Sequence, residues 1–286
     1  MYEILRKEKL GPAVFRMDIL APAVAKKHKA GNFIMLRIDE NGERIPLTVA
    51  DKNVDTGAVT LVFQVMGKTT ARLAEMNPGD ALLDFVGPLG KPAHVQSLPG
   101  AVVCIGGGIG VAPVHPIACA HKAAGNRVIS IMGARSKELL IMEAEMAKAS
   151  DELIITTDDG SYGKKGFVTQ ALEEVILREG KENISLTVAI GPVPMMRFCC
   201  KVTEKYEVKT EVSLNPIMVD ATGMCGACRV TVGGETKFAC VDGPEFDGHK
   251  VNFDELTKRL AMYKSHEAVS MEKHLHEHHG GKRCWE

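Results

Sequence analysis

Three cysteines and one aspartate carry the clearest chemistry in the sequence: Asp220, Cys225, Cys228 and Cys240. Their spacing is Asp-x4-Cys-x2-Cys-x11-Cys, whereas plant-type 2Fe-2S sites use Cys-x4-Cys-x2-Cys with a distant fourth cysteine. Asp220 therefore stands where the first thiolate would be, and the small residues between the ligands let the backbone wrap a cluster and offer amides to sulfur. Two interpretations stay open: Asp220 ligates iron through oxygen, or the three thiolates with Asp220 or His249 hold a structural zinc.

A glycine-rich loop follows a predicted strand over 101–105 and opens a predicted helix that runs through 124. Glycines there let the backbone approach a pyrophosphate, and free N–H groups at the helix start attract its charge. The loop departs from Gly-x-Gly-x-x-Gly because Val111 holds the sixth position, and Arg135 follows the second strand where an NAD site usually has an acidic residue. The predicted nucleotide contacts in this loop are Gly106, Gly107, Gly108 and Gly110.

Two further loops follow predicted parallel strands, at the edge of the sheet where ligands bind in this class of fold. One begins at Asp158 in Asp-Asp-Gly-Ser-Tyr-Gly-Lys-Lys-Gly, and the other is Gly191-Pro192-Val-Pro-Met-Met. We expect Asp158 near the ribose, and Gly191 and Pro192 beside the glycine loop. The three loops together favour a nucleotide site over a purely structural turn.

Two segments of the N-terminal part suggest a second ligand. Arg44-Ile-Pro-Leu-Thr-Val places a cation and a hydroxyl on one extended segment, able to meet a phosphate and a ring nitrogen of the same ligand. Gly67-Lys-Thr-Thr70 is either a solvated turn or a place where amides and hydroxyls hold another phosphate. Taken alone, both are also compatible with an ordinary strand and turn.

The composition is that of a folded, soluble protein of about two domains with room for a small third. The chain has 286 residues, 45% of them hydrophobic, and its 35 Lys and Arg against 36 Asp and Glu leave a net charge of -1. This balance lacks the positive field that nucleic-acid binding needs. No stretch has the ~18 apolar residues of a membrane span, and the charged start is unlike a signal peptide, so we expect a cytoplasmic protein.

Eight cysteines in a cytosolic chain indicate metal ligation or catalysis over disulfides. Four of them lie in apolar or helical contexts and are expected to be small buried side chains: Cys104, Cys119, Cys199 and Cys200.

Strand and turn signals predict an antiparallel β-barrel followed by an α/β domain with a parallel sheet and then by a small β-rich domain. The predicted boundaries are 1–97 for the barrel, 98–208 for the nucleotide-binding domain, 209–250 for the cysteine domain and 251–286 for a C-terminal helix with a His-rich polar tail. The last residue but one of the tail is Trp285, an aromatic residue that suits burial on a partner.

With these segments in this order, the sequence resembles the FAD- and 2Fe-2S-containing electron-transfer subunits of the ferredoxin-NADP reductase superfamily over nearly its whole length. Within this group it is most similar to the small subunits of NADH-dependent reduced ferredoxin:NADP oxidoreductases, and the dihydroorotate dehydrogenase electron-transfer subunits are the near relatives. The acidic residue at 220 favours the former. Two departures are Leu47, where relatives have an aromatic residue on the flavin, and Ile190, where many have cysteine.

The resemblance implies an enzyme that passes electrons between NAD(P)H, FAD and a 2Fe-2S cluster. It assigns Arg44 to the FAD phosphates, places Pro46, Leu47 and Thr48 at the flavin edge, and places Gly67, Thr69 and Thr70 on the pyrophosphate. It also implies a larger flavin and iron-sulfur partner subunit and contact with ferredoxin through that subunit. The nucleotide that it implies for this chain is NAD(H), in preference to NADP(H). The alternatives are a dihydroorotate dehydrogenase-type subunit and a non-enzymatic, zinc-stabilised nucleotide-binding regulator.

Overall fold

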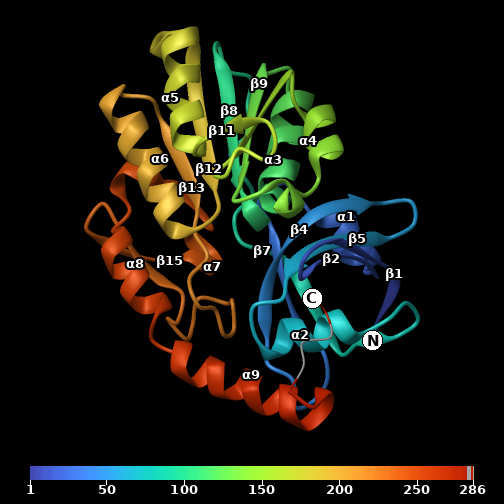
Figure 1. Ribbon diagram of the computed structural model, residues 1–286. Coiled ribbons are helices and arrows are strands. Elements are labelled where there is room, and N and C mark those ends of the chain that lie inside the picture. Colours follow the sequence, from blue (N-terminus) through green and yellow to red (C-terminus); the bar gives the residue numbers. More distant parts are fainter. Residues whose placement is uncertain (282–284, 286) are drawn as a thin grey trace.

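A computed structural model describes residues 1–281 and 285, and its first unit is a curved antiparallel sheet, drawn in blue and cyan in Figure 1. Its seven strands follow the order β6-β1-β2-β5-β4-β3-β7. The strands are β1 (Tyr2–Gly11), β2 (Val14–Leu20), β3 (Phe33–Arg37), β4 (Ile45–Asn53), β5 (Ala58–Gln64), β6 (Ala81–Leu82) and β7 (Asp84–Leu89), with α1 (Pro22–Lys27) and α2 (Lys68–Glu75). Every strand pair in this sheet is antiparallel, which confirms the predicted barrel.

The barrel interior is lined by every second residue of its longer strands. In β2, Phe15, Met17 and Ile19 are buried in one cluster with Leu61 and Phe63 of β5. This period of two is what the pleat of a strand requires, because successive side chains point to opposite faces.

The second unit is a sheet of order β11-β10-β9-β8-β12-β13-β16, in which only the β13–β16 pair is antiparallel. Its strands are β8 (Ala101–Gly107), β9 (Val128–Ala134), β10 (Glu152–Thr157), β11 (Lys164–Lys165), β12 (Ile184–Ile190), β13 (Thr210–Ser213) and β16 (Glu245–Asp247). The helices are α3 (Val111–Ala123), α4 (Glu143–Ala149), α5 (Val168–Glu179) and α6 (Val193–Lys205), with short 3-10 turns η1 (Gly108–Gly110), η2 (Lys137–Leu139), η3 (Lys181–Asn183) and η4 (Gly248–Lys250). Residues of α3 and α4 form one core with the sheet and residues of α5 and α6 form another, so helices cover both faces (Figure 1). This confirms the predicted parallel sheet.

The cysteine segment folds between β13 and β16 and carries β14 (Arg229–Val232), β15 (Glu235–Phe238) and α7 (Ala239–Asp242). Its buried residues pack against the barrel: Phe33 and Met35 of β3 share a cluster with Cys228 and Cys240. Because β13 and β16 complete the second sheet, two strands within 209–250 belong structurally to the preceding unit. The domain boundaries given above stay predictions.

Three of the four cysteines expected to be buried are buried, namely Cys104, Cys199 and Cys200. Cys119 is exposed, and that expectation was wrong. It lies one turn after His115 on α3, with its Sγ 3.4 Å from His115 Nε2, so the apolar run of this helix has a solvent-facing side at its end.

The C-terminal region differs from the expected helix and polar tail. After α8 (Phe253–Leu260), residues Lys264–His279 form a second helix, α9, which crosses from the cysteine segment to the barrel beside α2 (Figure 1). Met271 and Leu275 of α9 pack against the barrel core, and His274 Nε2 lies 3.1 Å from a carboxylate oxygen of Glu75. The spacing of Met271 and Leu275 is four residues, so both lie on one helix face.

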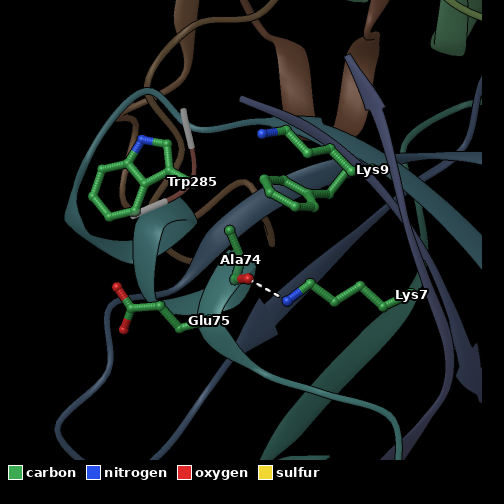
Figure 2. A pocket seen from close by; sticks show the side chains of 6 residues that line it. Lys7, Lys9, Ala74, Glu75 and Trp285 are labelled. Carbon is green, nitrogen blue, oxygen red and sulfur yellow. Dashed lines mark hydrogen bonds between the residues drawn. The ribbon is translucent and has the colours of Figure 1, made fainter. Parts of the chain in front are cut away.

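Trp285 folds back onto the chain's own barrel, which corrects the expectation that it is free for a partner. It is 5% exposed and belongs to the barrel cluster. Figure 2 shows its indole beside Ala74 and Glu75 of α2, in a pocket whose other lining residues include Lys7 and Lys9 of β1. Cys284 and the other tail residues at 282, 283 and 286 lie outside the described residues.

Trp285→Ala should lower the free energy of unfolding by about 3 kcal/mol, because a buried indole leaves a cavity that the barrel wall cannot fill. Chemical denaturation followed by circular dichroism measures this. The matched control is Val269→Ala on α9, 66% exposed, which should change stability by less than about 0.5 kcal/mol. Equal effects of the two substitutions would contradict the assignment of Trp285 to the barrel core.

The junction between the two large units contains a buried carboxyl group. A Cβ at Gly31 would lie 2.7 Å from Glu245 Oε1, so this oxygen faces the barrel. Among the described residues, that buried oxygen has no hydrogen-bond partner. Burial, with a smaller contribution from Glu211, raises the pKa of Glu245 from 4.5 to about 8.

Glu245→Gln should change the pH dependence of stability. The folded chain binds the Glu245 proton more tightly than the unfolded chain, so wild-type stability should fall as pH rises from about 4.5 to about 8. The amide variant loses that part of the dependence and should unfold at a higher temperature than wild type above pH 8, as thermal melts across pH would show. Melting temperatures of wild type and Glu245→Gln that change in parallel with pH would contradict a raised pKa at Glu245.

Within residues 1–281 and 285, no helix combines the length and apolar character needed to cross a bilayer.

Candidate cofactor and nucleotide sites

Two of the predicted metal-ligating thiols face each other inside the cysteine segment. Cys228 Sγ and Cys240 Sγ are 3.2 Å apart, and the Cys240 amide donates to Cys228 Sγ at 3.5 Å. Both are buried, Cys228 before β14 and Cys240 in α7. Burial, and then the Cys228 thiol, raise the pKa of Cys240 above its ordinary value, and a bound metal would take the place of the thiol proton.

The other two predicted ligands lie on the exposed side of the same loop. The Cys225 amide donates to Asp220 Oδ2 at 3.0 Å, and the Thr222 amide donates to Oδ1 at 2.9 Å. These hydrogen bonds, that of Thr222 first, lower the pKa of Asp220 and keep it a carboxylate. Left-handed backbone at Ala221 (φ 59°) and Gly226 (φ 67°) curls the loop around the two side chains.

The four side chains therefore form two pairs, Cys228 with Cys240 and Asp220 beside Cys225. Two pairs suit a binuclear cluster, in which each iron takes two protein ligands. Among the described residues, no three His, Cys, Asp or Glu side chains group tightly enough for one ion. His249 is not a ligand here: its Nε2 lies 2.9 Å from Thr203 Oγ1 on α6. The residues present fit a 2Fe-2S cluster better than the structural zinc considered above.

The glycine loop is packed closely against the loop after β12. A Cβ at Gly110 would lie 2.2 Å from the carbonyl oxygen of Ile190, and one at Gly107 would lie 2.2 Å from Met195 Sδ. The structure thus brings the glycine loop together with Gly191 and Pro192. These two loops follow β8 and β12, which are neighbours in the sheet. From β8 the chain adds β9, β10 and β11 on one side, and β12 and β13 lie on the other side. Parallel sheets bind nucleotides at such switch points in the strand order.

Arg135 and Asp158 lie at the ends of the next two strands, β9 and β10. The Asp158 amide donates to the Ala134 carbonyl at 3.1 Å, and the Asp159 amide donates to the Arg135 carbonyl at 3.2 Å. Both predicted side chains are exposed. Because β9 separates β10 from β8, Arg135 is one strand and Asp158 two strands away from the glycine loop.

In the barrel, the segment with Pro46, Leu47 and Thr48 is the start of β4, paired with β3. Leu47 packs against the barrel core. Pro46 and Thr48 lie on the opposite face of the strand, because the side chains of a strand alternate. They are paired with Met35 and Phe33, respectively.

That pairing reveals two residues that the sequence analysis missed. Phe33 and Met35 lie next to Thr48 and Pro46 across the strands, and they also pack in one cluster with Cys228 and Cys240. The predicted flavin edge and the predicted cluster site are therefore separated by one apolar layer. No signal in the sequence marks these residues, since their place depends on the β3–β4 register.

The start of α2 lies beside the loop that precedes β4. Buried Thr69 donates a hydrogen bond to the carboxylate of Glu43, the neighbour of Arg44. Thr70 caps the helix, since its Oγ1 accepts from the Gly67 amide at 3.1 Å. The space beside Gly67 is open, with nothing within 4 Å of an added Cβ. Arg44 Nη2 is 3.7 Å from Asp84 Oδ2 of β7, and its side chain is half-exposed.

The start of α2 and the glycine loop each offer backbone amides that can meet an anion, and the cysteine segment offers two pairs of metal-ligating side chains. Comparison with known proteins supports a nucleotide-binding sheet and an iron-sulfur segment. A model of the oxidoreductase NAD-binding domain matches residues 104–201, and a model of the iron-sulfur cluster binding domain of dihydroorotate dehydrogenase B matches residues 215–252.

The chain is similar to proteins over nearly their whole lengths. A Thermotoga maritima protein described as a homologue of the dihydroorotate dehydrogenase B electron transfer subunit is 50% identical, over 96% of this chain and 95% of its own. The electron transfer subunit of Geobacillus thermodenitrificans dihydroorotate dehydrogenase B is 31% identical, over 87% and 96%. A solved structure of an NADH-dependent reduced ferredoxin-NADP oxidoreductase superposes with a TM-score of 0.90 at 48% identity, over 96% of this chain and 98% of that one.

Proposed function

The chain belongs to the family of dihydroorotate dehydrogenase B electron transfer subunits, and from this premise we propose that it is the flavin and iron-sulfur subunit of a ferredoxin:NAD(P) oxidoreductase. In this function it oxidises or reduces NAD(P)(H) at FAD and relays electrons through a 2Fe-2S cluster to a larger partner subunit. The observation that carries the proposal is the apolar layer of Phe33 and Met35, which joins the Pro46–Thr48 strand to Cys228 and Cys240.

When bound, FAD exchanges a hydride with the nicotinamide and single electrons with the cluster, and this chemistry belongs to the cofactors. The chain binds and orients them. We assign Arg44, Gly67, Thr69 and Thr70 to the FAD phosphates, Pro46, Thr48 and the backbone of Leu47 to the flavin, and Gly106, Gly107, Gly108, Gly110, Gly191 and Pro192 to the pyridine nucleotide. Asp220, Cys225, Cys228 and Cys240 are the proposed iron ligands.

Each group of residues has a physical task. The amides at the start of α2 and the Arg44 cation favour phosphate charge. Because Gly110 has no Cβ, the glycine loop packs closely against Ile190, and its backbone amides can meet a pyrophosphate. Phe33 and Met35 exclude water between the two cofactor sites. No general acid or base is required for these steps.

The surface around Cys225 is suited to binding a larger partner subunit. The exposed thiol is accompanied by apolar side chains that are unusually open to solvent, with Met224 88% exposed, Val219 55% and Val241 39%. A buried cluster with one apolar exposed edge provides a short route for electrons to leave, and contiguous exposed apolar residues mark interaction sites. Free thiols in this number suit the cytoplasm, where we propose that the protein works.

The nearest rival within the family is a subunit that serves dihydroorotate oxidation. Asp220 in place of the first cysteine favours the ferredoxin:NAD(P) enzyme, as does the structural similarity to that enzyme. Co-purification with the partner decides between the two: dihydroorotate should not reduce the complex, whereas reduced ferredoxin with NAD(P) should turn over.

Cofactor content tests the proposal directly. Protein purified without oxygen should contain one FAD and about two iron and two sulfide per chain, with the absorption of a 2Fe-2S cluster. Stoichiometric zinc in a colourless protein would instead support the nucleotide-binding regulator.

Nucleotide preference is a separate prediction. We expect NADH to reduce the flavin faster than NADPH, and Arg135→Ala to change the NADH rate by less than about twofold, because an exposed cation one strand from the glycine loop contributes little to binding NADH. Stopped-flow reduction with each nucleotide measures this. A strong NADPH preference that Arg135→Ala abolishes would show that Arg135 reads a 2′-phosphate.

A further inference from the structure

Helix α8 connects the nucleotide-binding unit to the cysteine segment. Phe253 and Leu256 are buried in the core that contains α5 and α6, and Asp254 pairs with Arg197 of α6 at 2.6 Å. On its other side, Glu255 accepts a hydrogen bond from Thr231 of β14 at 2.5 Å. The helix is therefore anchored at its start to both structural units.

Arg259, one turn further along α8, reaches the metal-ligating loop. Its Nη2 donates to the carbonyl oxygen of Ala227 at 2.9 Å. Ala227 lies between Cys225 and Cys228, and its own amide lies 3.5 Å from Cys225 Sγ. The Nε atom of Arg259 is buried and has no hydrogen-bond partner among the described residues. A buried guanidinium N–H without a protein acceptor costs free energy, which a negatively charged group held by this loop would offset.

We propose that Arg259 is a positioning residue that holds the Cys225–Cys228 loop and, through its charge, raises the reduction potential of the 2Fe-2S cluster. The inference rests on the proposed function, because it requires that Asp220 and the three cysteines bind that cluster. It adds a residue from outside the cysteine segment to the group that determines how readily the cluster accepts an electron.

Electrostatics gives the sign of the effect. Reduction adds one negative charge to the cluster, and a nearby cation stabilises the reduced form more than the oxidised form. The stabilisation survives in salt because the guanidinium is partly buried, whereas exposed charges are screened. Neighbouring Lys258 is exposed on α8 and makes no described contact with the loop, so its charge should matter far less.

The carbonyl contact adds a geometric effect. An N–H donated by a charged group is roughly twice as strong as a neutral one, and here it holds the Ala227–Cys228 peptide. The neighbouring Gly226–Ala227 peptide carries the amide that lies 3.5 Å from Cys225 Sγ, so holding the first limits the movement of the second. Loss of the contact should therefore loosen the loop as well as remove the charge.

The test is an EPR-monitored redox titration of the holoprotein with three substitutions. Arg259→Gln removes the charge and keeps a donor, Arg259→Lys keeps the charge and loses the planar fork, and Lys258→Met is the matched control for loss of a cation on the same helix. Arg259→Gln should lower the midpoint potential, while Arg259→Lys should stay near wild type and Lys258→Met should equal it. Iron content and hydrogen exchange at residues 225–228 provide readouts that do not depend on activity.

Two outcomes would overturn the inference: an unchanged potential in Arg259→Gln, or an equal shift in Lys258→Met. If Arg259→Gln bound no cluster, faster exchange of the loop amides in the metal-free protein than in metal-free wild type would support the positioning role, and equal exchange would refute it. A wild-type protein without any 2Fe-2S signal would instead show that the proposed function has failed.

Discussion

Replacing Cys228 by Ser should remove the cluster from the chain and stop electron delivery to an external acceptor, while NADH still reduces the flavin. Cys228 is 2% exposed and pairs with Cys240 at 3.2 Å, so a hydroxyl in its place leaves one iron without a soft ligand. Iron should fall from about two per chain to near zero. Metal analysis and the EPR spectrum after reduction measure the loss.

The control for this substitution is Cys119→Ser, which changes an exposed thiol on α3, outside the cysteine segment. It should retain the cluster and both electron-transfer steps. A Cys228→Ser protein with its iron and EPR signal intact would contradict the assignment of the ligands, and loss of flavin reduction in this variant would contradict the order of electron flow.

Gly110→Ala should slow flavin reduction by NADH about 100-fold, because a displacement of about 1 Å between reacting groups has that effect. The added Cβ would lie 2.2 Å from the Ile190 carbonyl oxygen and 2.7 Å from Gly191 Cα, and both are backbone atoms that cannot rotate away. The loop after β12 must therefore move away from the nucleotide site. Stopped-flow absorbance of the flavin gives the rate, and the cluster signal after chemical reduction should be unchanged.

Gly125→Ala, just after α3 and outside the nucleotide site, separates collision from backbone strain. Gly125 has φ +82° and nothing within 4 Å of an added Cβ, so this substitution costs only the left-handed conformation, about 1 kcal/mol. Its flavin reduction should stay near the wild-type rate. If the two variants were equally slow, the packing of the glycine loop on the β12 loop would not be the cause.

Local patterns in the sequence sufficed for features that depend on neighbouring residues. The spacing from Asp220 to Cys240 predicted the iron-sulfur domain that a family model matches over residues 215–252, and the loop around Gly110 predicted the NAD-binding domain matched over residues 104–201. Both depend on short stretches whose backbone geometry follows from glycine and from strand-to-helix turns.

Features that depend on long-range packing were not predictable in this way. Trp285 was expected on a partner but lies on the barrel, because α9 carries it across the molecule. His249 was a candidate ligand, but the fold turns its ring toward Thr203. Leu47 was grouped with Pro46 and Thr48, but strand alternation directs it into the barrel core.

Electrons should pass from NADH to FAD and then from FAD to the cluster across the layer formed by Phe33 and Met35. Anaerobic rapid mixing with NADH, followed by both flavin absorbance and freeze-quench EPR, resolves this order. Flavin bleaching should come first, the EPR signal of a reduced 2Fe-2S cluster should follow, and FAD-depleted protein should give no such signal. A cluster reduced at the same rate without FAD, or flavin reduction with no cluster signal in iron-replete protein, would contradict it.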